Sequence, residues 1–266
     1  MIIPHCLTIA GSDSCGGAGI QGDLKTFTVL GAYGMAVITA LTAQNTGEVR
    51  GVHAVPADFV RLQLATVLDD IRCDAAKTGM LANADIVRAV AGELGRRPRF
   101  PLVADPVMVS TSGARLLEED AVDAVRGRLL PLCAVATPNA PEAEILTGIK
   151  IRAIEDTERA ARAIHGMGAA AVLVKGGDVE YEPGTVTDVL YDGVTASRLR
   201  SRRIASRTAH GSGCALASAI CVGLARGHSV HEAVDMARRF VYKAIAEGRI
   251  IGREAGPVNH LCQQTW

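Results

Sequence analysis

The sequence predicts an α/β fold, with a mostly parallel β-sheet between two layers of helices. Short apolar runs rich in Val, Ile and Leu alternate with longer stretches of helical periodicity that carry charges on one face. The apolar runs are continuous, which is typical of parallel strands buried on both faces. Two further short runs flank Asp192-Gly193, a strong hairpin signal. We therefore expect a three-layer α/β/α fold with a small antiparallel hairpin at one edge of the sheet.

The expected elements follow one another without a linker, a low-complexity run or an internal repeat, so we expect residues 1–266 to form a single domain. Buried strands are predicted at Cys6–Ala10, Met35–Leu41, Pro101–Ala104, Cys133–Ala136 and Ala170–Val174. Helices are predicted at about Asp58–Ile71, Ala84–Leu94, Glu118–Leu130, Thr157–Met167 and Gly213–Ala225. The hairpin is predicted to pair Thr187–Tyr191 with Thr195–Leu199.

Composition points to a small-molecule partner. Lys plus Arg and Asp plus Glu both total 28, and aromatic residues make up 3%, so neither a basic surface nor stacking platforms for nucleic acid are expected. The N-terminus lacks the features of a signal peptide and no apolar run is long enough for a membrane span, so we expect a cytoplasmic protein without a membrane partner. The seven cysteines form no C-x-x-C pair, and we expect most of them to be small core residues.

One segment near the C-terminus predicts an anion site. Gly211, Ser212, Gly213 and Cys214 directly precede an apolar helix pattern. Glycines before a helix start leave backbone N–H groups unpaired, and the helix dipole favours an anion there, so a phosphate is the expected occupant. The same field would stabilise the thiolate of Cys214, and the combination predicts phosphoryl transfer. His210 precedes this loop, whereas we interpret the other six histidines as structural.

Polar residues also follow several predicted strands. In open α/β sheets ligands bind at the carboxyl ends of the strands, so these residues could line one cleft. Asn139 and Glu142 could hold a hydrated Mg²⁺ with support from Asp105, although Asn139 could equally cap the next helix. Lys175, followed by Gly176, could place an ammonium beside a triphosphate, or could simply be solvated.

The acceptor side of the cleft is predicted from less specific signals. Gln44 offers a donor and an acceptor on one side chain, which suits a neutral heterocycle, but it could also be an ordinary loop amide. Met80 and Val107 are either packing residues or apolar walls of the same slot. The G-x-G-x-x-G match at 17–22 lies six residues beyond its strand, and no acid follows the next strand, so we interpret it as a substrate loop rather than an NAD site. A P-loop motif is absent, so ATP would be bound by another fold.

Taken together, these motifs resemble the hydroxymethylpyrimidine and phosphomethylpyrimidine kinases of thiamine biosynthesis, which belong to the ribokinase superfamily. The matching segments follow the family order over nearly the whole chain. They are Leu7–Ser14, Gly16–Gln21, Asp23–Thr26, Ile38–Thr46, Lys77–Met80, Asp105–Met108, Thr137–Asn139 with Pro141–Ala143, Val174–Gly177, His210–Cys214 and Gly256–Val258.

The resemblance implies a ribokinase-like fold, usually a homodimer, that uses Mg-ATP to phosphorylate 4-amino-5-hydroxymethyl-2-methylpyrimidine and then its monophosphate. It implies that Cys214 is the base, that the preceding loop is the anion hole and that Gln44 holds the pyrimidine. The other expected substrate contacts are Gly11, Ala18, Asp23, Met80 and Val107. The expected nucleotide contacts are Asn139, Glu142, Lys175, Gly176 and His210, with Asp105 near the metal.

The chain departs from the family pattern at four positions, Ala209, Asp178, Ser212 and Asn259. Ala209 lacks the usual hydroxyl and Asp178 adds a negative charge, so both bear on nucleotide binding, whereas Ser212 keeps the hydroxyl of the usual threonine. The alternatives are a pyridoxal or pyridoxine kinase of the same fold, a catalytically silent binding protein of ribokinase fold and, more distantly, an NAD-binding oxidoreductase.

Overall fold

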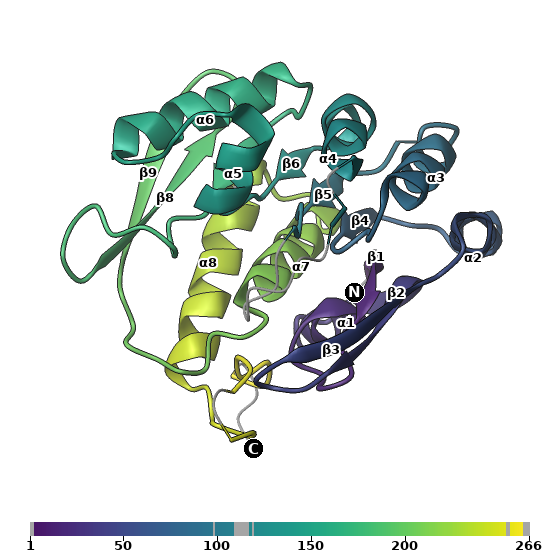
Figure 1. The fold of residues 1–266 in the computed structure, drawn as a ribbon, viewed down its shortest axis with the longest axis horizontal. Helices are drawn as coiled ribbons and strands as arrows, with labels where there is room; N and C mark the ends of the chain where they lie inside the picture. The colour runs from purple at the N-terminus through teal and green to yellow at the C-terminus, as the bar shows by residue number, and fades with distance from the viewer. Residues whose placement is uncertain (1–2, 98, 109–116, 119, 254–255, 263–266) are drawn as a thin grey trace.

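The fold is built on one nine-stranded sheet in the order β3-β2-β1-β4-β5-β6-β7-β8-β9 (Figure 1). The computed structural model describes residues 3–97, 99–108, 117–118, 120–253 and 256–262. The strands are β1 (His5–Ser12), β2 (Tyr33–Gln44), β3 (Val49–Ala54), β4 (Ala75–Thr78), β5 (Leu102–Ala104), β6 (Val135–Ala136), β7 (Val172–Val174), β8 (Thr185–Tyr191) and β9 (Ala196–Arg202).

The centre of the sheet is parallel and both of its edges are antiparallel. β1 pairs in parallel with β2 and β4, and parallel pairing continues from β4 to β7. At one edge, β8 runs antiparallel to β7 and to β9. The Asp192-Gly193 turn joins β8 to β9, and Gly193 has a φ of 95°, which a glycine adopts without strain. At the other edge, β3 runs antiparallel to β2.

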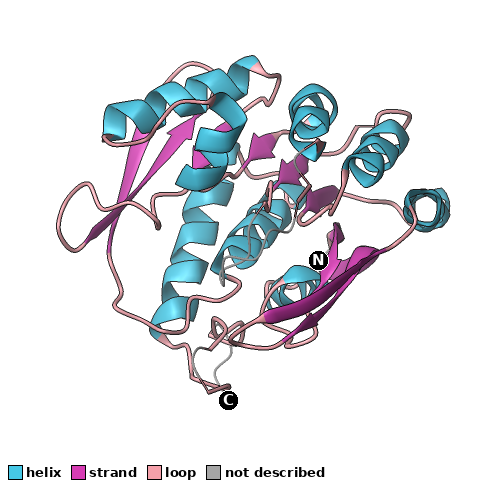
Figure 2. Ribbon diagram, in the orientation of Figure 1, coloured by secondary structure: helices cyan, strands magenta, loops and turns pink. Residues whose placement is uncertain are grey.

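Helices cover both faces of the sheet, and each layer encloses its own apolar core (Figure 2). Alternate residues of the strands enter opposite cores, so Leu7 and Ile9 of β1 pack in one while Cys6 packs in the other. One layer contains α2 (Ala57–Asp70), α3 (Ala84–Leu94), α4 (Ala121–Ala124), α5 (Ala140–Thr147) and α6 (Ile154–Gly166). The other contains α1 (Gly19–Val29), α7 (Ser212–Ala225) and α8 (Val230–Ala246).

The predicted three-layer α/β class and its edge hairpin are therefore confirmed. Five elements lie outside the predicted ranges: β3, β4, α1, α5 and α8. β3 is mostly exposed and contains no continuous apolar run, and β4 is interrupted by Lys77. The sequence of α8, by contrast, is amphipathic and carries the same signal as the predicted helices. Within the described residues, no helix has the length and apolar character that a membrane crossing requires.

The predicted helix Glu118–Leu130 is wrong in form, and its residue 119 lies outside the described residues. Only Ala121–Ala124 is α-helical; a π-turn at Val125–Leu129 and a 3-10 turn at Leu130–Leu132 follow. Pro131 has no N–H group to donate and its ring crowds the preceding turn, which explains why a regular α-helix does not continue through this segment.

Candidate functional site

A cleft of about 650 Å³ opens at the carboxyl ends of the parallel strands. Residues at or just beyond the ends of β1, β2, β4, β5, β6 and β7 contribute to its walls, together with the start of α7. All but two of the predicted site residues line it. They are Gly11, Ala18, Gln44, Met80, Asp105, Val107, Asn139, Glu142, Lys175, His210, Gly211, Ser212, Gly213 and Cys214.

The loop before α7 has the geometry of an anion site. Gly211 is the N-cap residue of α7 with a φ of 80°, and a Cβ at this position would lie 1.9 Å from the carbonyl oxygen of Gly17. Only glycine therefore fits here. The first helical bond runs from Ala215 N–H to Gly211 C=O at 2.9 Å, so the amides of Gly213 and Cys214 precede the hydrogen-bonded ladder of the helix. These amides and the helix dipole favour a bound anion.

Lys175 lies beside this anion loop. A Cβ on Gly213 would lie 3.3 Å from Lys175 Nζ, so the absence of a side chain lets the ammonium approach the helix start. Lys175 Nζ donates to Asp105 Oδ1 at 2.6 Å and lies 3.9 Å from Glu142 Oε2. Burial by itself would lower the pKa of Lys175, but Asp105 and Glu142 raise it above its usual value. The lysine is therefore a fixed cation.

Asn139 does cap α5, so this interpretation of the motif is confirmed. The Asn139 side chain accepts from Glu142 N–H at 2.8 Å, and Glu142 Oε2 accepts from Asn139 N–H at 2.8 Å, which forms a capping box. Burial raises the pKa of Glu142 to about 7, while Lys175 opposes that rise and Asp105 adds to it. The cap orients Glu142 toward Lys175, so the capping role and a role in the cleft are compatible.

Cys214 differs from the expectation in its ionisation. The side chain is partly exposed to the cleft, yet desolvation by the surrounding protein raises its pKa to about 11, although the charge of Lys77 and an N–H of Gly19 act in the opposite direction. The predicted stabilisation of the thiolate is therefore wrong. Cys214 carries a thiol at neutral pH.

Asp23, one of the predicted substrate contacts, is instead fully buried below the cleft. Both of its oxygens lie 3.0 Å from Lys77 Nζ. Oδ2 also accepts from Thr8 Oγ1 at 2.6 Å, and Oδ1 accepts from Ser218 Oγ at 2.7 Å. Burial alone would lower the pKa of Lys77, but Asp23 raises it, with smaller contributions from Cys214 and Asp105. The expected direct contact of Asp23 with substrate is thus replaced by an internal ion pair that joins β1, α1, β4 and α7.

Gly176 is the second predicted residue that does not line the cleft. Its N–H donates to Asp188 Oδ1 at 2.8 Å, and a Cβ on it would lie 2.0 Å from the carbonyl oxygen of Thr187. The glycine is needed because β8 packs directly against it. We therefore correct its expected role from nucleotide contact to close packing of the hairpin.

On the acceptor side of the cleft, two of the predicted residues pack against each other. A Cβ on Gly11 would lie 2.7 Å from Met80 Cε, so the two residues pack directly together. Gln44 Oε1 accepts from Thr42 Oγ1 at 3.2 Å, and no described residue pairs with the Nε2 group of Gln44. Ala209 and Asp178, two of the departures from the family pattern, also line the cleft.

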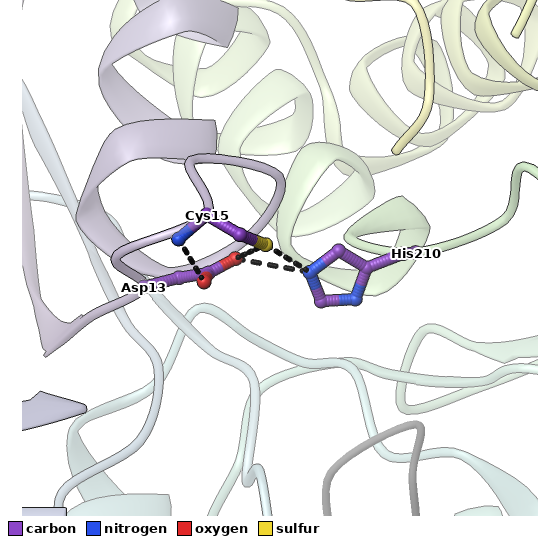
Figure 3. Close-up of side chains that lie close together, drawn as sticks. All are labelled: Asp13, Cys15 and His210. Atoms are coloured by element: carbon purple, nitrogen blue, oxygen red, sulfur yellow. Dashed lines mark hydrogen bonds and ion pairs between the residues drawn. The ribbon is translucent and has the colours of Figure 1, made fainter. Parts of the chain in front are cut away.

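Sequence reasoning missed a cluster formed by Asp13, Cys15 and His210 (Figure 3). His210 Nε2 lies 2.9 Å from Asp13 Oδ2 and 3.6 Å from Cys15 Sγ. Burial opposes ionisation of Asp13, but hydrogen bonds from His210, Cys15 and Ala18 hold its pKa at about 2. Cys15 is therefore not the core residue that we expect from its type. No sequence signal could reveal the cluster, because its members come from segments almost 200 residues apart.

Comparison with known proteins places these features in a family. Residues 13–259 match the family described as phosphomethylpyrimidine kinase. The hydroxymethylpyrimidine/phosphomethylpyrimidine kinase of Streptomyces coelicolor is 48% identical over 97% of this chain and 94% of its own length. The thiamine biosynthesis bifunctional protein ThiED of Geobacter sulfurreducens is 49% identical over 96% of this chain, which spans about half (52%) of that protein.

Among solved structures, the pyridoxal kinase from Staphylococcus aureus in complex with AMP-PCP and pyridoxal superimposes with a TM-score of 0.90. Its sequence is 37% identical, and the match covers 98% of this chain and 94% of the other. This similarity agrees with the ribokinase-like fold that the resemblance implies. The family match covers most of the described cleft and the segments that carry its polar side chains. The chain belongs to the phosphomethylpyrimidine kinase family.

Proposed function

We propose that this chain phosphorylates the hydroxymethyl group of 4-amino-5-hydroxymethyl-2-methylpyrimidine with Mg-ATP, and then phosphorylates the resulting monophosphate to the diphosphate. One observation carries the proposal: the anion loop with Cys214, the Lys175 ammonium and the Gln44 amide all line a single cleft. Membership of the phosphomethylpyrimidine kinase family supports the same acceptor.

The anion loop and Lys175 would stabilise the transferred phosphoryl group. In phosphoryl transfer the negative charge spreads over the three equatorial oxygens, and catalysis depends on groups already positioned around them. The amides of Gly213 and Cys214 face this charge from the helix start, and Lys175 Nζ adds a cation held by Asp105 at 2.6 Å. Neither donor has to reorganise as the charge develops.

Cys214 would accept the proton of the substrate hydroxyl as that oxygen attacks the γ-phosphorus. Because its pKa is about 11, only roughly one molecule in 10⁴ carries the thiolate at pH 7. The hydroxyl step should therefore accelerate as pH rises. The monophosphate offers an oxygen that is already anionic, since its second pKa is about 6, so the second step needs little help from a base.

ATP and Mg²⁺ are part of the proposal. Asp105 and Glu142 present two carboxylates to the cleft. Asp105 Oδ2 lies outside the pair with Lys175, and Glu142 Oε1 lies outside the capping hydrogen bond, with a long contact of 3.4 Å from Met108 N–H. Such oxygen donors fit Mg²⁺ that retains part of its water shell, with the Asn139 side chain nearby. When bound, the ion would neutralise part of the negative charge of the nucleotide phosphates.

A second acceptor, pyridoxal, has a specific observation in its favour, because the Staphylococcus aureus pyridoxal kinase shares the fold with a TM-score of 0.90. The two acceptors share a hydroxymethyl arm on an aromatic nitrogen heterocycle. The Gln44 amide favours the pyrimidine, because one side chain can pair with both the ring nitrogen and the adjacent amino group.

The proposed enzyme acts as one kinase domain over residues 1–266, as a homodimer in the cytoplasm.

One experiment tests the proposed reaction. The protein is incubated with Mg-ATP and, in turn, the pyrimidine alcohol, its monophosphate and pyridoxal, and the products are identified by mass. We expect both pyrimidine compounds to gain one phosphoryl group. Exclusive phosphorylation of pyridoxal would overturn the pyrimidine assignment, and no ADP release with any acceptor would overturn the kinase assignment.

A further inference from the structure

Three potential metal-ligand atoms converge where the Gly-rich loop that follows β1 (residues 13–18) meets the anion loop. Figure 3 shows the side chains of Asp13, Cys15 and His210 pointing toward one another. The separations are 2.9 Å from His210 Nε2 to Asp13 Oδ2, 3.3 Å from Cys15 Sγ to Asp13 Oδ2 and 3.6 Å from Cys15 Sγ to His210 Nε2. The mechanism proposed above uses none of these three contacts.

The pattern of contacts does not suit a proton relay. In a Cys–His–Asp relay the thiol and the carboxylate contact different nitrogens of the imidazole. Here both contact the same nitrogen, Nε2 of His210. The sulfur, the nitrogen and the oxygen instead form a compact triangle, which is the arrangement that three ligands take around one metal ion.

The size of this triangle matches one face of a tetrahedral zinc site. Zn–S, Zn–N and Zn–O bonds of about 2.3, 2.0 and 2.0 Å place the ligand atoms about 3.3 to 3.6 Å apart. The three separations of 2.9 to 3.6 Å lie close to that range, so ligation requires movements of only a few tenths of an ångström. A thiolate, an imidazole and a carboxylate form a donor set that favours Zn²⁺ over Mg²⁺.

The surroundings of Asp13 hold it in position for ligation. Its side chain is 4% exposed, Oδ2 accepts from the N–H groups of Gly17 and Ala18 at 3.1 and 2.8 Å, and Oδ1 accepts from Cys15 N–H at 3.0 Å. In metal sites of proteins, hydrogen bonds of this kind orient the carboxylate that binds the ion. Asp13 and His210 also line the cleft, so a fourth ligand can reach the site from there.

We propose that Asp13 Oδ2, Cys15 Sγ and His210 Nε2 form a binding site for Zn²⁺ or a similar thiophilic divalent cation. On binding, the Cys15 thiol releases its proton to solvent, and His210 uses the tautomer that carries its proton on Nδ1. Water occupies the fourth position in the absence of another ligand. The bound ion joins the Gly-rich loop to the residue that precedes the anion loop, and this site is separate from the Mg²⁺ position proposed at Asp105 and Glu142.

The test uses the full chain, stripped of metal and free of ATP, Mg²⁺ and substrate. Zn²⁺ is titrated against a chromophoric chelator, and Co²⁺ is titrated in parallel as a spectroscopic substitute. We expect one ion per chain and a thiolate-to-cobalt charge-transfer band. Cys15→Ser and His210→Gln should each weaken Zn²⁺ binding by more than about tenfold, since loss of even an outer-shell partner costs 10- to 100-fold. Cys15→Ser should also abolish the band.

Cys73→Ser is the matched control, because Cys73 is a half-buried thiol whose contact is the Ala75 carbonyl oxygen, at the opposite end of the sheet from the cleft. Its Zn²⁺ affinity should equal that of the wild type. A second readout needs no variant: Zn²⁺ should protect Cys15, but not Cys73, from alkylation in the wild-type protein, as measured by peptide mass. Unchanged Zn²⁺ affinity in Cys15→Ser, or equal alkylation of Cys15 with and without Zn²⁺, overturns the proposal. Neither result bears on the proposed kinase reaction.

Discussion

Lys77 and Asp23 form an ion pair with no solvent exposure, with Lys77 Nζ 3.0 Å from both carboxylate oxygens. The pair lies below the cleft. Burial raises the pKa of Cys214, and the charge of Lys77 partly opposes that rise. The role of the pair is therefore both structural and electrostatic.

Removing one partner of this pair should destabilise the fold strongly. Lys77→Met leaves the Asp23 carboxylate buried without its counter-ion, and such losses typically cost about 3–5 kcal/mol. Urea denaturation followed by circular dichroism measures the change in the free energy of unfolding. Arg88→Met removes the exposed Arg88–Asp85 pair on α3 and should change that free energy by less than about 1 kcal/mol. Similar values for the two variants would contradict the importance of the buried pair.

Cys214→Ala should separate the two phosphorylations. General bases typically contribute about 10²- to 10⁴-fold to a rate, so kcat for the hydroxymethyl acceptor should fall by roughly 10²-fold or more. The monophosphate acceptor supplies its own anionic oxygen and should lose less than about tenfold. Both rates are measured by ADP release on one preparation, with Cys73→Ser as the control thiol. Equal losses in the two steps would reject Cys214 as the base.

The pH dependence of the two steps should also differ. The Cys214 pKa of about 11 means that the thiolate fraction rises about tenfold for each pH unit from pH 7 to pH 9. The kcat for the hydroxyl acceptor should rise accordingly, whereas kcat for the monophosphate should stay nearly constant, because its phosphate is ionised throughout this range. Rates for the two acceptors are compared in the same buffers. If kcat for the two acceptors changes with pH in the same way, Cys214 does not act as the base in the hydroxyl step.

Gln44→Ala should weaken binding of the pyrimidine by roughly tenfold or more while ATP affinity is unchanged. The substitution removes a donor and an acceptor for the ring, and a hydrogen bond to a neutral group contributes about 0.5–1.5 kcal/mol. Calorimetric titration of each ligand separately measures both affinities. Asn45→Ser is a suitable control, because a serine oxygen can still accept from the turn amides of Gly47 and Glu48. Undiminished pyrimidine affinity in Gln44→Ala would show that Gln44 does not hold the ring.

His260 should make the fold sensitive to acid. Burial, with the nearby charges of Lys25 and His210, lowers its pKa from 6.5 to about 4. As pH falls below 6.5, the unfolded chain binds a proton that the folded chain does not bind until about pH 4, so stability falls within this window. The difference corresponds to about 3 kcal/mol between pH 7 and pH 4.

His260→Phe should remove this dependence of the free energy of unfolding on pH. Within the described residues, His260 Nε2 has no hydrogen-bond partner, so the substitution leaves no polar group unpaired at that atom. Urea denaturation at several pH values compares the variant with the wild type and with His228→Gln, which changes an exposed histidine. If the wild type and His260→Phe lose stability in parallel, His260 is not the group responsible.

The parts of the site that can be predicted from the sequence are those formed by residues that are close together in the chain. The anion loop, the Asn139–Glu142 pair and Gln44 are each read from neighbouring residues, because a helix start or a strand end specifies its own local geometry. The alternation of apolar runs likewise predicts the layered sheet. β3 could not be predicted in this way, because an exposed edge strand has no need of a continuous apolar run.

The misplaced or missed residues depend on contacts between distant segments. The family resemblance implies that Asp23 contacts substrate, but its partner Lys77 lies 54 residues away and neutralises its charge inside the protein. Asp13 and His210 are 197 residues apart, and only the folded sheet brings them together. Gly176 resembles a phosphate-loop glycine in the sequence, although the reason for it is the backbone of Thr187.

The contact between Gly211 and Gly17 has a consequence for how the acceptor specificity can diverge. These two loops touch backbone to backbone, with no side chain between them, so their spacing is insensitive to most substitutions elsewhere in the cleft. The ring of the acceptor, by contrast, would be surrounded by replaceable side chains such as Gln44, Met80 and Val107. A few substitutions around the ring can therefore change the acceptor. The spacing between the loops that contain Gly17 and Gly211 would stay the same.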